Sequence, residues 1–327
     1  MKRRSFIAFL GSTACTSPLA AHAQQQSLPA IGYLNAAASD GYAESLRAFR
    51  RALNDGGYVE GENVAIEYRW ADNEPDRLPV LAADLARRYV SVIVAASAPA
   101  SLAAAKATTT IPIVFLVPED PVRLGLVISL ARPGGNATGI NFFAAELAAK
   151  RLELLRALVP DAKRVAALLN AAEPTIEAAN RRQLEAAAAG MGLHLHLINA
   201  GTIAEIDAAF AVLASDRPDA LFISSGPFFA TRSVQLAQLA ARHGIPAIGG
   251  SRRYSEVGGL ITYGASVTDA HRQAGIYTGR ILKGAKAADL PVVQSTKFEL
   301  VINASTARMF GITLPPALLA TADEVVE

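Results

Sequence analysis

The sequence predicts an α/β fold made of two doubly wound lobes, each built on a parallel sheet. Short apolar runs rich in β-branched residues alternate with Ala-rich runs of helical period. Aromatic residues make up only 6% of the chain, and this scarcity beside abundant Ala, Leu and Val is typical of helices packed on buried parallel strands. About 300 residues follow the N-terminal segment, which is enough for one large domain or two ordinary ones.

Ten short runs have the composition of buried strands. In chain order they cover residues 30–34, 63–70, 91–95, 113–117, 139–143, 165–170, 193–198, 220–224, 247–249 and 260–263. Helical periodicity lies between them, as in the apolar set Leu147, Leu152, Leu155 and Leu158. A further helix is expected over Val122–Ala131. Strands that alternate with helices in this way predict βαβ units and parallel sheets.

One local pattern occurs twice in the chain. Residues 107–115 end a helix, pass through Ile-Pro and enter an apolar strand, and residues 241–249 do the same 134 positions later. Proline is tolerated at a strand entry, where a missing N–H does little harm. Because the spacing equals the size of one α/β domain, two similar lobes in succession are the simplest interpretation. The Pro- and Gly-rich stretch 132–139 is the expected first crossing between them.

Residues 1–23 have the layout of a cleaved export signal. A basic start at residues 2–4 precedes an apolar stretch over 6–20 and a small-x-small site at 21–23. The Arg-Arg pair predicts the twin-arginine route. The apolar stretch is too short and too interrupted for a bilayer, which needs about 20 apolar residues.

The single cysteine, Cys15, raises a lipoprotein alternative, but Ser12 stands where a lipobox has an aliphatic residue. Cleavage after Ala23 would leave the mature chain without cysteine. It would also leave 28 basic and 29 acidic residues, a net charge of −1. Nothing in this balance predicts binding to nucleic acid or to anionic lipid.

The sequence lacks the common signatures of phosphate loops, dinucleotide folds, nucleophile elbows and zinc helices. His194 and His196 share one strand face; a half-exposed face is the preferred interpretation, and a metal pair is the alternative. His243 is expected at a helix end and His271 on the surface near a helix start. The adjacent acids at 119–120 rarely converge on one substrate atom. We therefore predict no metal, cofactor or catalytic residue.

Ligands of open parallel sheets bind beyond the carboxyl ends of the strands, and small or polar residues follow the predicted strands here. The helices that come next offer free N–H groups for an anion. Ser39, Ser97 and Asp120 are equally suited to cap those helices. The expected ligand-binding residues are Asn35, Ser39, Ser97, Ala98, Asp120, Asn170, Ser225 and Phe228.

Two of these expectations are more specific. Asp120 lies just before Pro121, which disfavours a helical conformation there, and it is the preferred acid to hold an ammonium or a hydroxyl. Phe228 and Phe229 either stack on the ligand or pack between the lobes, and core packing is expected for at least one of them.

The order and spacing of several motifs resemble one family over residues 30–327. Besides the twin-arginine start, they are Ile31–Asn35, Gly57–Trp70, Arg77–Pro79, Thr109–Val114, Asp120-Pro121, Arg132–Gly139, Lys150–Leu155 and Thr296–Asn303. This pattern resembles the substrate-binding proteins of ABC transporters, in the family related to tryptophan- and tyrosine-binding members.

The resemblance implies a type I periplasmic-binding-protein fold, in which three hinge strands join two lobes that close on a ligand. It implies a first lobe over 30–140 and 262–290 and a second over 141–261 and 291–327. The ligand contacts of relatives match the loop residues chosen above. Relatives often place Gly before the Asp-Pro pair, whereas this chain has Pro118-Glu119, which leaves the amino-acid specificity open.

The leading hypothesis is a periplasmic, monomeric binding protein. It would capture a small polar or amino-acid-like ligand by hinge closure and deliver it to an ABC permease, its only link to the membrane. Two alternatives stay open. An exported hydrolase-type enzyme would need Ser97 or Ser225 beside His243 or His271. A ligand sensor would act through a separate receptor.

Overall fold

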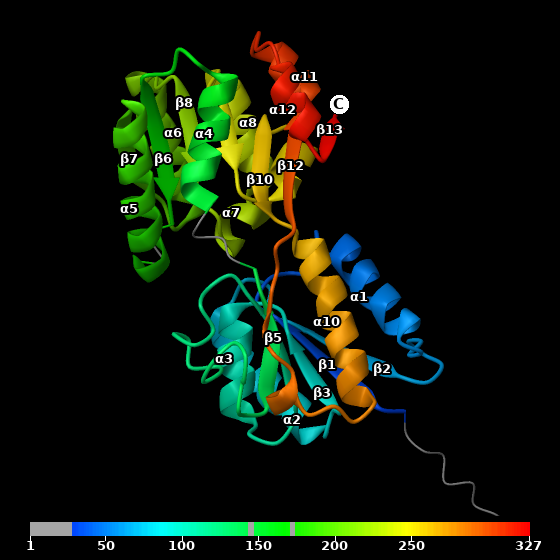
Figure 1. Ribbon diagram of the computed structural model, residues 1–327. Coiled ribbons are helices and arrows are strands. Elements are labelled where there is room, and N and C mark those ends of the chain that lie inside the picture. Colours follow the sequence, from blue (N-terminus) through cyan, green and yellow to red (C-terminus); the bar gives the residue numbers. More distant parts are fainter. Residues whose placement is uncertain (1–27, 143–146, 171–173) are drawn as a thin grey trace, which may run out of the picture.

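The computed structural model describes residues 28–142, 147–170 and 174–327, and it confirms an α/β fold with two sheet-based lobes (Figure 1). The predicted export signal lies outside the described residues. In the described part of the chain, no helix is long and apolar enough to cross a membrane.

The first lobe contains a six-stranded sheet in the order β11-β5-β4-β3-β1-β2, and every neighbouring pair is parallel. Its N-terminal elements are β1 (Ala30–Asn35), α1 (Ala43–Asp55), β2 (Ala65–Trp70), η1 (Pro75–Arg77), α2 (Leu78–Arg87), β3 (Val92–Ala95), α3 (Ala98–Ala107), β4 (Ile113–Val117) and β5 (Ala137–Asn141). Three later elements complete it: α10 (Val267–Leu282), η3 (Ala287–Asp289) and β11 (Val293–Gln294).

The second lobe contains a seven-stranded sheet in the order β13-β12-β10-β9-β8-β6-β7, parallel except between β10 and β12. Its first elements are α4 (Ala148–Leu158), β6 (Arg164–Leu169), α5 (Pro174–Met191), β7 (His194–Asn199), α6 (Ile203–Asp216), β8 (Ala220–Ile223) and α7 (Pro227–Thr231). The rest are α8 (Ser233–His243), β9 (Ala247–Gly249), α9 (Arg252–Glu256), β10 (Ile261–Ala265), β12 (Phe298–Asn303), α11 (Ala304–Met309), α12 (Pro316–Thr321) and β13 (Glu324–Val326).

Helices cover both faces of each sheet, which explains why the central strands read as continuous apolar runs. In the first lobe, one core lies between the sheet and α2–α3, and another lies under the paired helices α1 and α10. The second lobe has the same arrangement, with α4 and α5 over one face and α6, α8 and α9 over the other. All five residues of β4 are buried for this reason.

The chain passes between the lobes three times: after β5, between β10 and α10, and between β11 and β12. Sheet membership moves the expected lobe boundaries. Residues 262–265 were expected in the first lobe, but β10 pairs with β9 and β12 in the second. Residues 291–294 were expected in the second lobe, but β11 pairs with β5 in the first. Both differences arise because backbone pairing, which the sequence pattern does not reveal, continues past the predicted crossings.

Three further expectations need correction. The chain over Val122–Ala131 forms turns instead of a helix, because Gly125 takes a φ of +72° and the Ser129 hydroxyl bonds the backbone of Arg132. The helix α1 begins after Tyr42, so Ser39 does not cap it. The strands β11–β13 were not predicted; β11 and β13 are very short, and β12 pairs with strands that lie elsewhere in the chain.

Candidate ligand-binding site

The topology turns the carboxyl ends of both sheets toward each other. β5 and β11 run out of the first lobe toward the second, and β10 runs out of the second lobe toward the first. Since β5 is parallel to β4 and β10 is parallel to β9, the ends of β1, β3 and β4 face those of β6, β8 and β9. Figure 1 places α7, which follows β8, at this end of the second lobe. The predicted ligand loops therefore belong to two facing edges.

On the first lobe, the ends of β1 and β3 carry two of the predicted residues. Asn35 is fully buried; its Oδ1 accepts a hydrogen bond from the N–H of Ala37 at 3.0 Å, and its Nδ2 has no partner. Ser97 caps α3, with Oγ accepting the N–H of Ala100 at 3.3 Å. Ala98, the first residue of α3, is also buried. The amide of Asn35 is thus buried at the edge, near the hydroxyl groups of Tyr33 and Tyr42, while the hydroxyl of Ser97 caps the helix.

The two adjacent acids of the loop after β4 have different environments. Asp120 is exposed, and its Oδ1 accepts the N–H groups of Val122 at 2.9 Å and Arg123 at 3.4 Å, so it stabilises a turn. Glu119 has a buried Oε2 without a hydrogen-bond partner, and desolvation raises the pKa of its carboxyl group. Asn141 at the end of β5 donates from Nδ2 to Glu119 O at 2.7 Å, while its own Oδ1 is buried and unpaired. Two unpaired acceptors therefore lie on neighbouring strand ends.

On the second lobe, a buried charged group lies under the ends of β6 and β8. Glu177 accepts the N–H of Asn170 at 3.0 Å and the hydroxyl of Ser224 at 2.7 Å through Oε1. Arg151 is fully buried, lies over the ring of Phe222, and donates from Nη1 to the carbonyl that ends β8 at 3.3 Å. Its Nε and Nη2 have no partner. Burial lowers the pKa of Arg151 to about 10, which leaves it charged at neutral pH.

Ser225 and Gly250 lie beside this guanidinium at the edge of the sheet. A Cβ on Gly250 would stand 2.0 Å from Ser225 Oγ and 2.8 Å from Arg151 Nη1, so only glycine lets these groups approach the backbone. Ser225 and Gly250 are both half-buried. Phe229 is buried in the core, as expected for one ring of the pair, whereas Phe228 is half-buried with Arg232 over its ring.

A cluster of aromatic rings supports the first-lobe edge. The ring of Tyr33 in β1 contacts those of Phe49, Tyr68 and Trp70. Its hydroxyl lies 3.0 Å from Nε2 of His271, whose Nδ1 lies 2.8 Å from the carbonyl of Val267. His271 was expected on the surface, and this was wrong: α10 packs against α1 and covers it. Burial lowers the pKa of His271 to about 4, so the ring is neutral at pH 7.

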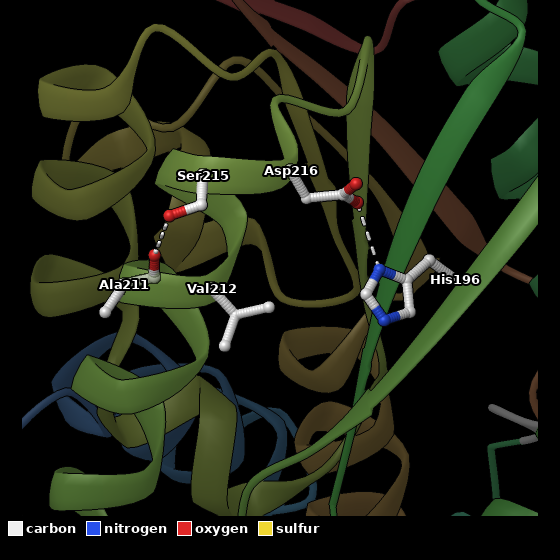
Figure 2. Close-up of a pocket in the computed structure, with 5 residues that line it drawn as sticks. All are labelled: His196, Ala211, Val212, Ser215 and Asp216. Atoms are coloured by element: carbon white, nitrogen blue, oxygen red, sulfur yellow. Dashed lines mark hydrogen bonds and ion pairs between the residues drawn. The ribbon is translucent and has the colours of Figure 1, made fainter.

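The histidines of β7 lie away from the facing edges. His194 and His196 are both exposed, as the strand-face interpretation predicted. In the hollow of Figure 2, His196 Nδ1 lies 3.1 Å from Asp216 Oδ2, beside Val212 and Ser215. Within residues 28–142, 147–170 and 174–327, no group of three His, Cys, Asp or Glu side chains is arranged to hold a metal ion.

The predicted site residues lie at or near strand ends, but the sequence pattern did not single out several buried polar side chains there. Asn141 lay hidden inside a predicted strand, and Glu119 was set aside as part of an adjacent acid pair. Arg151 had a visible signal, because it is four residues from both Leu147 and Leu155 and so shares their apolar helix face. A charged side chain on such a face either reaches solvent at the margin of the face or is buried, and a buried charge needs a partner or has a functional role.

Two sheet-based lobes with polar edges that face each other define a two-lobed ligand-binding protein of the type I periplasmic fold, and comparisons with known proteins agree. The family model described as ABC transporter substrate binding protein matches residues 31–326. The chain therefore belongs to this family.

Individual relatives resemble the chain over most of its length. It is 27% identical to a tyrosine-binding protein of Clostridioides difficile over 270 residues, which cover 80% of this chain and 75% of the relative. A conserved domain protein from Vibrio cholerae superposes with a TM-score of 0.82 at 26% identity, covering 91% and 100% of the two chains. An ABC domain in complex with L-Trp from Streptococcus pneumonia gives 0.80 at 26% identity, covering 92% and 100%.

Proposed function

We propose that this chain is a periplasmic binding protein that captures a small amino-acid-like solute between its two lobes and delivers it to an ABC permease. The observation that carries the proposal is the set of buried polar atoms without partners on the facing edges, Asn35 Nδ2, Glu119 Oε2, Asn141 Oδ1 and the Arg151 nitrogens. Buried polar groups are normally hydrogen-bonded, and unpaired ones at a binding edge gain a partner when a ligand arrives.

Further support comes from the relatives, since one is named for tyrosine and another was crystallised with L-Trp. The predicted loop residues Asn35, Ser97, Ala98, Asn170 and Ser225 all lie on the proposed binding edges. Ser39 and Asp120 are exposed on loops of the same edge, and Phe228 adds a half-buried ring. We keep these eight residues as the proposed ligand-binding set. We assign no cofactor and no catalytic residue to it.

A binding role needs no covalent chemistry, whereas the hydrolase alternative needs a nucleophile and a base in contact. Ser97 Oγ caps α3, and His271 bonds to Tyr33 and to a backbone carbonyl. Among the described residues, no serine hydroxyl is hydrogen-bonded to a histidine. This arrangement favours binding over hydrolysis. Export, with the permease as the only membrane contact and a monomeric state, completes the proposal.

The proposal is tested by ligand-dependent thermal stabilisation. A ligand that binds only the folded state adds about 2.7 kcal/mol at 100 times its Kd, which raises Tm by several degrees. The protein is purified from its exporting host, native mass spectrometry identifies any co-purified solute, and thermal shifts are recorded with the twenty amino acids and a panel of other polar metabolites. A folded protein that carries no solute and shifts with none of them would contradict the proposal.

A further inference from the structure

We infer that the two lobes recognise opposite charges of one zwitterionic ligand: Glu119 and Asn141 of the first lobe bind its ammonium group, and its carboxylate binds at Ser225 and Gly250 over Arg151 of the second. This inference rests on the proposed function and adds the ligand's charge pattern and orientation. It also moves the ammonium contact from Asp120 to Glu119.

The first lobe presents acceptors to an ammonium group. Glu119 Oε2 and Asn141 Oδ1 are buried, unpaired and unable to satisfy each other, since a carboxylate and an amide oxygen both accept. The two residues are neighbours, because Asn141 Nδ2 donates to the backbone carbonyl of Glu119 at 2.7 Å and to that of Val117 at 3.0 Å. These two bonds hold the loop in place. Asp120 Oδ1 accepts hydrogen bonds from the backbone of the following turn. An ammonium has three donors and fits two such acceptors.

The second lobe presents donors and positive charge to a carboxylate. Arg151 is fully buried, and two of its three guanidinium nitrogens have no partner. In the part of the chain that the structure describes, no carboxylate lies within ion-pair distance of it. Glu177 contributes a more distant negative charge, but its oxygens already accept from Asn170, Asn180 and Ser224. The positive charge of Arg151 is therefore only partly compensated within the protein.

The binding surface over this charge consists of Ser225 and Gly250. Both are half-buried at the sheet edge, and Ser225 Oγ and Arg151 Nη1 pack so closely against the Cα of Gly250 that a side chain there would clash. A carboxylate that contacts Ser225 from the side that faces the first lobe accepts from its hydroxyl and lies above the positive charge of Arg151. Desolvated charge-assisted hydrogen bonds of this kind are strong, and a planar guanidinium is suited to a carboxylate.

The test uses L-Trp and L-Tyr with three probes derived from them: indole-3-propanoate, which lacks the ammonium, and tryptamine and tyramine, which lack the carboxylate. The variants are Glu119→Gln and Arg151→Lys, with Glu153→Gln at an exposed position of α4 as the charge-matched control. We expect Glu119→Gln to weaken amino-acid binding by about 10- to 100-fold and to leave indole-3-propanoate unaffected. Arg151→Lys is expected to weaken amino-acid binding by a similar factor and to leave the binding of tryptamine and tyramine unaffected. Glu153→Gln is expected to bind all probes like wild type.

Stability separates recognition from folding damage. Because Glu119 is desolvated and unpaired, its Gln variant is expected to have an unchanged or higher Tm without ligand, so lost affinity cannot come from unfolding. Asp120→Asn keeps the turn-capping oxygen and serves as the competing variant.

The outcomes distinguish the two proposals. If amino acids bind and Glu119→Gln retains wild-type affinity, or Asp120→Asn alone loses it, the charge assignment is wrong and the binding function stands. The same holds if wild type binds only a solute without an ammonium or without a carboxylate. If no solute of any class binds the folded protein, the proposed function itself fails.

Discussion

The two lobes share an architecture but bury different kinds of polar group. Under the first edge, the buried ionisable side chain is His271, neutral and held by the Tyr33 hydroxyl and a backbone carbonyl. Under the second edge it is Arg151, which stays charged and has two unpaired nitrogens, with Glu177 nearby. A hydrogen-bonded neutral group is cheap to bury, whereas a buried ion costs several kcal/mol unless its partners are good.

This difference indicates that the buried charge lowers the folding stability of the second lobe at its proposed binding edge. In the first lobe, the buried polar groups of Tyr33 and His271 are hydrogen-bonded to each other and stabilise the fold. The burial of Arg151 is only partly compensated by one hydrogen bond, the ring of Phe222 and the charge of Glu177, and incomplete compensation of this kind is expected more often at functional sites. In the first lobe, the buried and unpaired Oε2 of Glu119 has a smaller energetic cost of the same kind. The comparison therefore predicts effects of different size and different pH dependence in the two lobes.

The largest effect is expected from Glu177→Ala in the second lobe. The change removes the negative charge nearest to Arg151 and leaves the hydroxyl of Ser224 and the N–H of Asn170 without this acceptor. We expect the free energy of unfolding to fall by about 3–5 kcal/mol in urea titrations. Glu185→Ala, exposed on the same helix, should stay within about 0.5 kcal/mol of wild type. Equal losses in the two variants would refute the special role of the buried carboxylate of Glu177.

An intermediate effect is expected from His271, and it depends on pH. The folded pKa is lowered to about 4 from an ordinary value of 6.5, so between these pH values the unfolded chain binds a proton that the folded chain does not. Stability is retained above pH 6.5 and falls as the pH drops, by about 3 kcal/mol once the pH is below 4. His271→Gln removes this contribution, so its urea midpoint should change less than that of wild type between pH 7 and pH 4.5. Parallel pH profiles would contradict the assignment.

The smallest effect is expected from the helix caps, one in each lobe. Ser97 caps α3 at the binding edge, and Thr202 caps α6 with the reciprocal Glu205 bond of a capping box. Each change to Ala should cost about 1 kcal/mol in stability. Only Ser97→Ala should also reduce ligand-induced stabilisation, because Thr202 follows β7, an outermost strand of the second sheet, and none of the proposed contacts follows that strand. If both variants keep the full ligand shift, Ser97 is a cap and nothing more.

Much of the fold followed from pattern alone. Ile113–Val117 and Ala247–Gly249 were predicted to the residue, and nearly all other predicted strands differ by two residues or fewer at each end. Buried parallel strands are continuous apolar runs between helices, so composition marks them well. The strands β11–β13 were not predicted from the sequence, because they are defined by pairing partners elsewhere in the chain. A strand of two residues, such as β11, has no periodic pattern of its own.

The candidate site divides in the same way. Asn35, Ser97 and Ser225 could be located because a residue that follows a parallel strand lies at the carboxyl edge whatever its neighbours are. The role of each side chain could not be predicted in this way. Asp120 and Glu119 are adjacent, yet Asp120 Oδ1 accepts a hydrogen bond within a turn, whereas Glu119 Oε2 is buried and has no hydrogen-bond partner.

The sequence by itself determined the alternation of strands and helices, the two-lobed plan and the loops that meet between the lobes, because local periodicity and strand polarity are properties of short segments. Only the tertiary structure decided where β10 and β11 pair, that α10 buries His271, and that Arg151 and Glu119 keep unpaired atoms at facing edges. Burial and hydrogen-bond satisfaction depend on residues that are distant in sequence, and they set both the energy and the chemistry of each group.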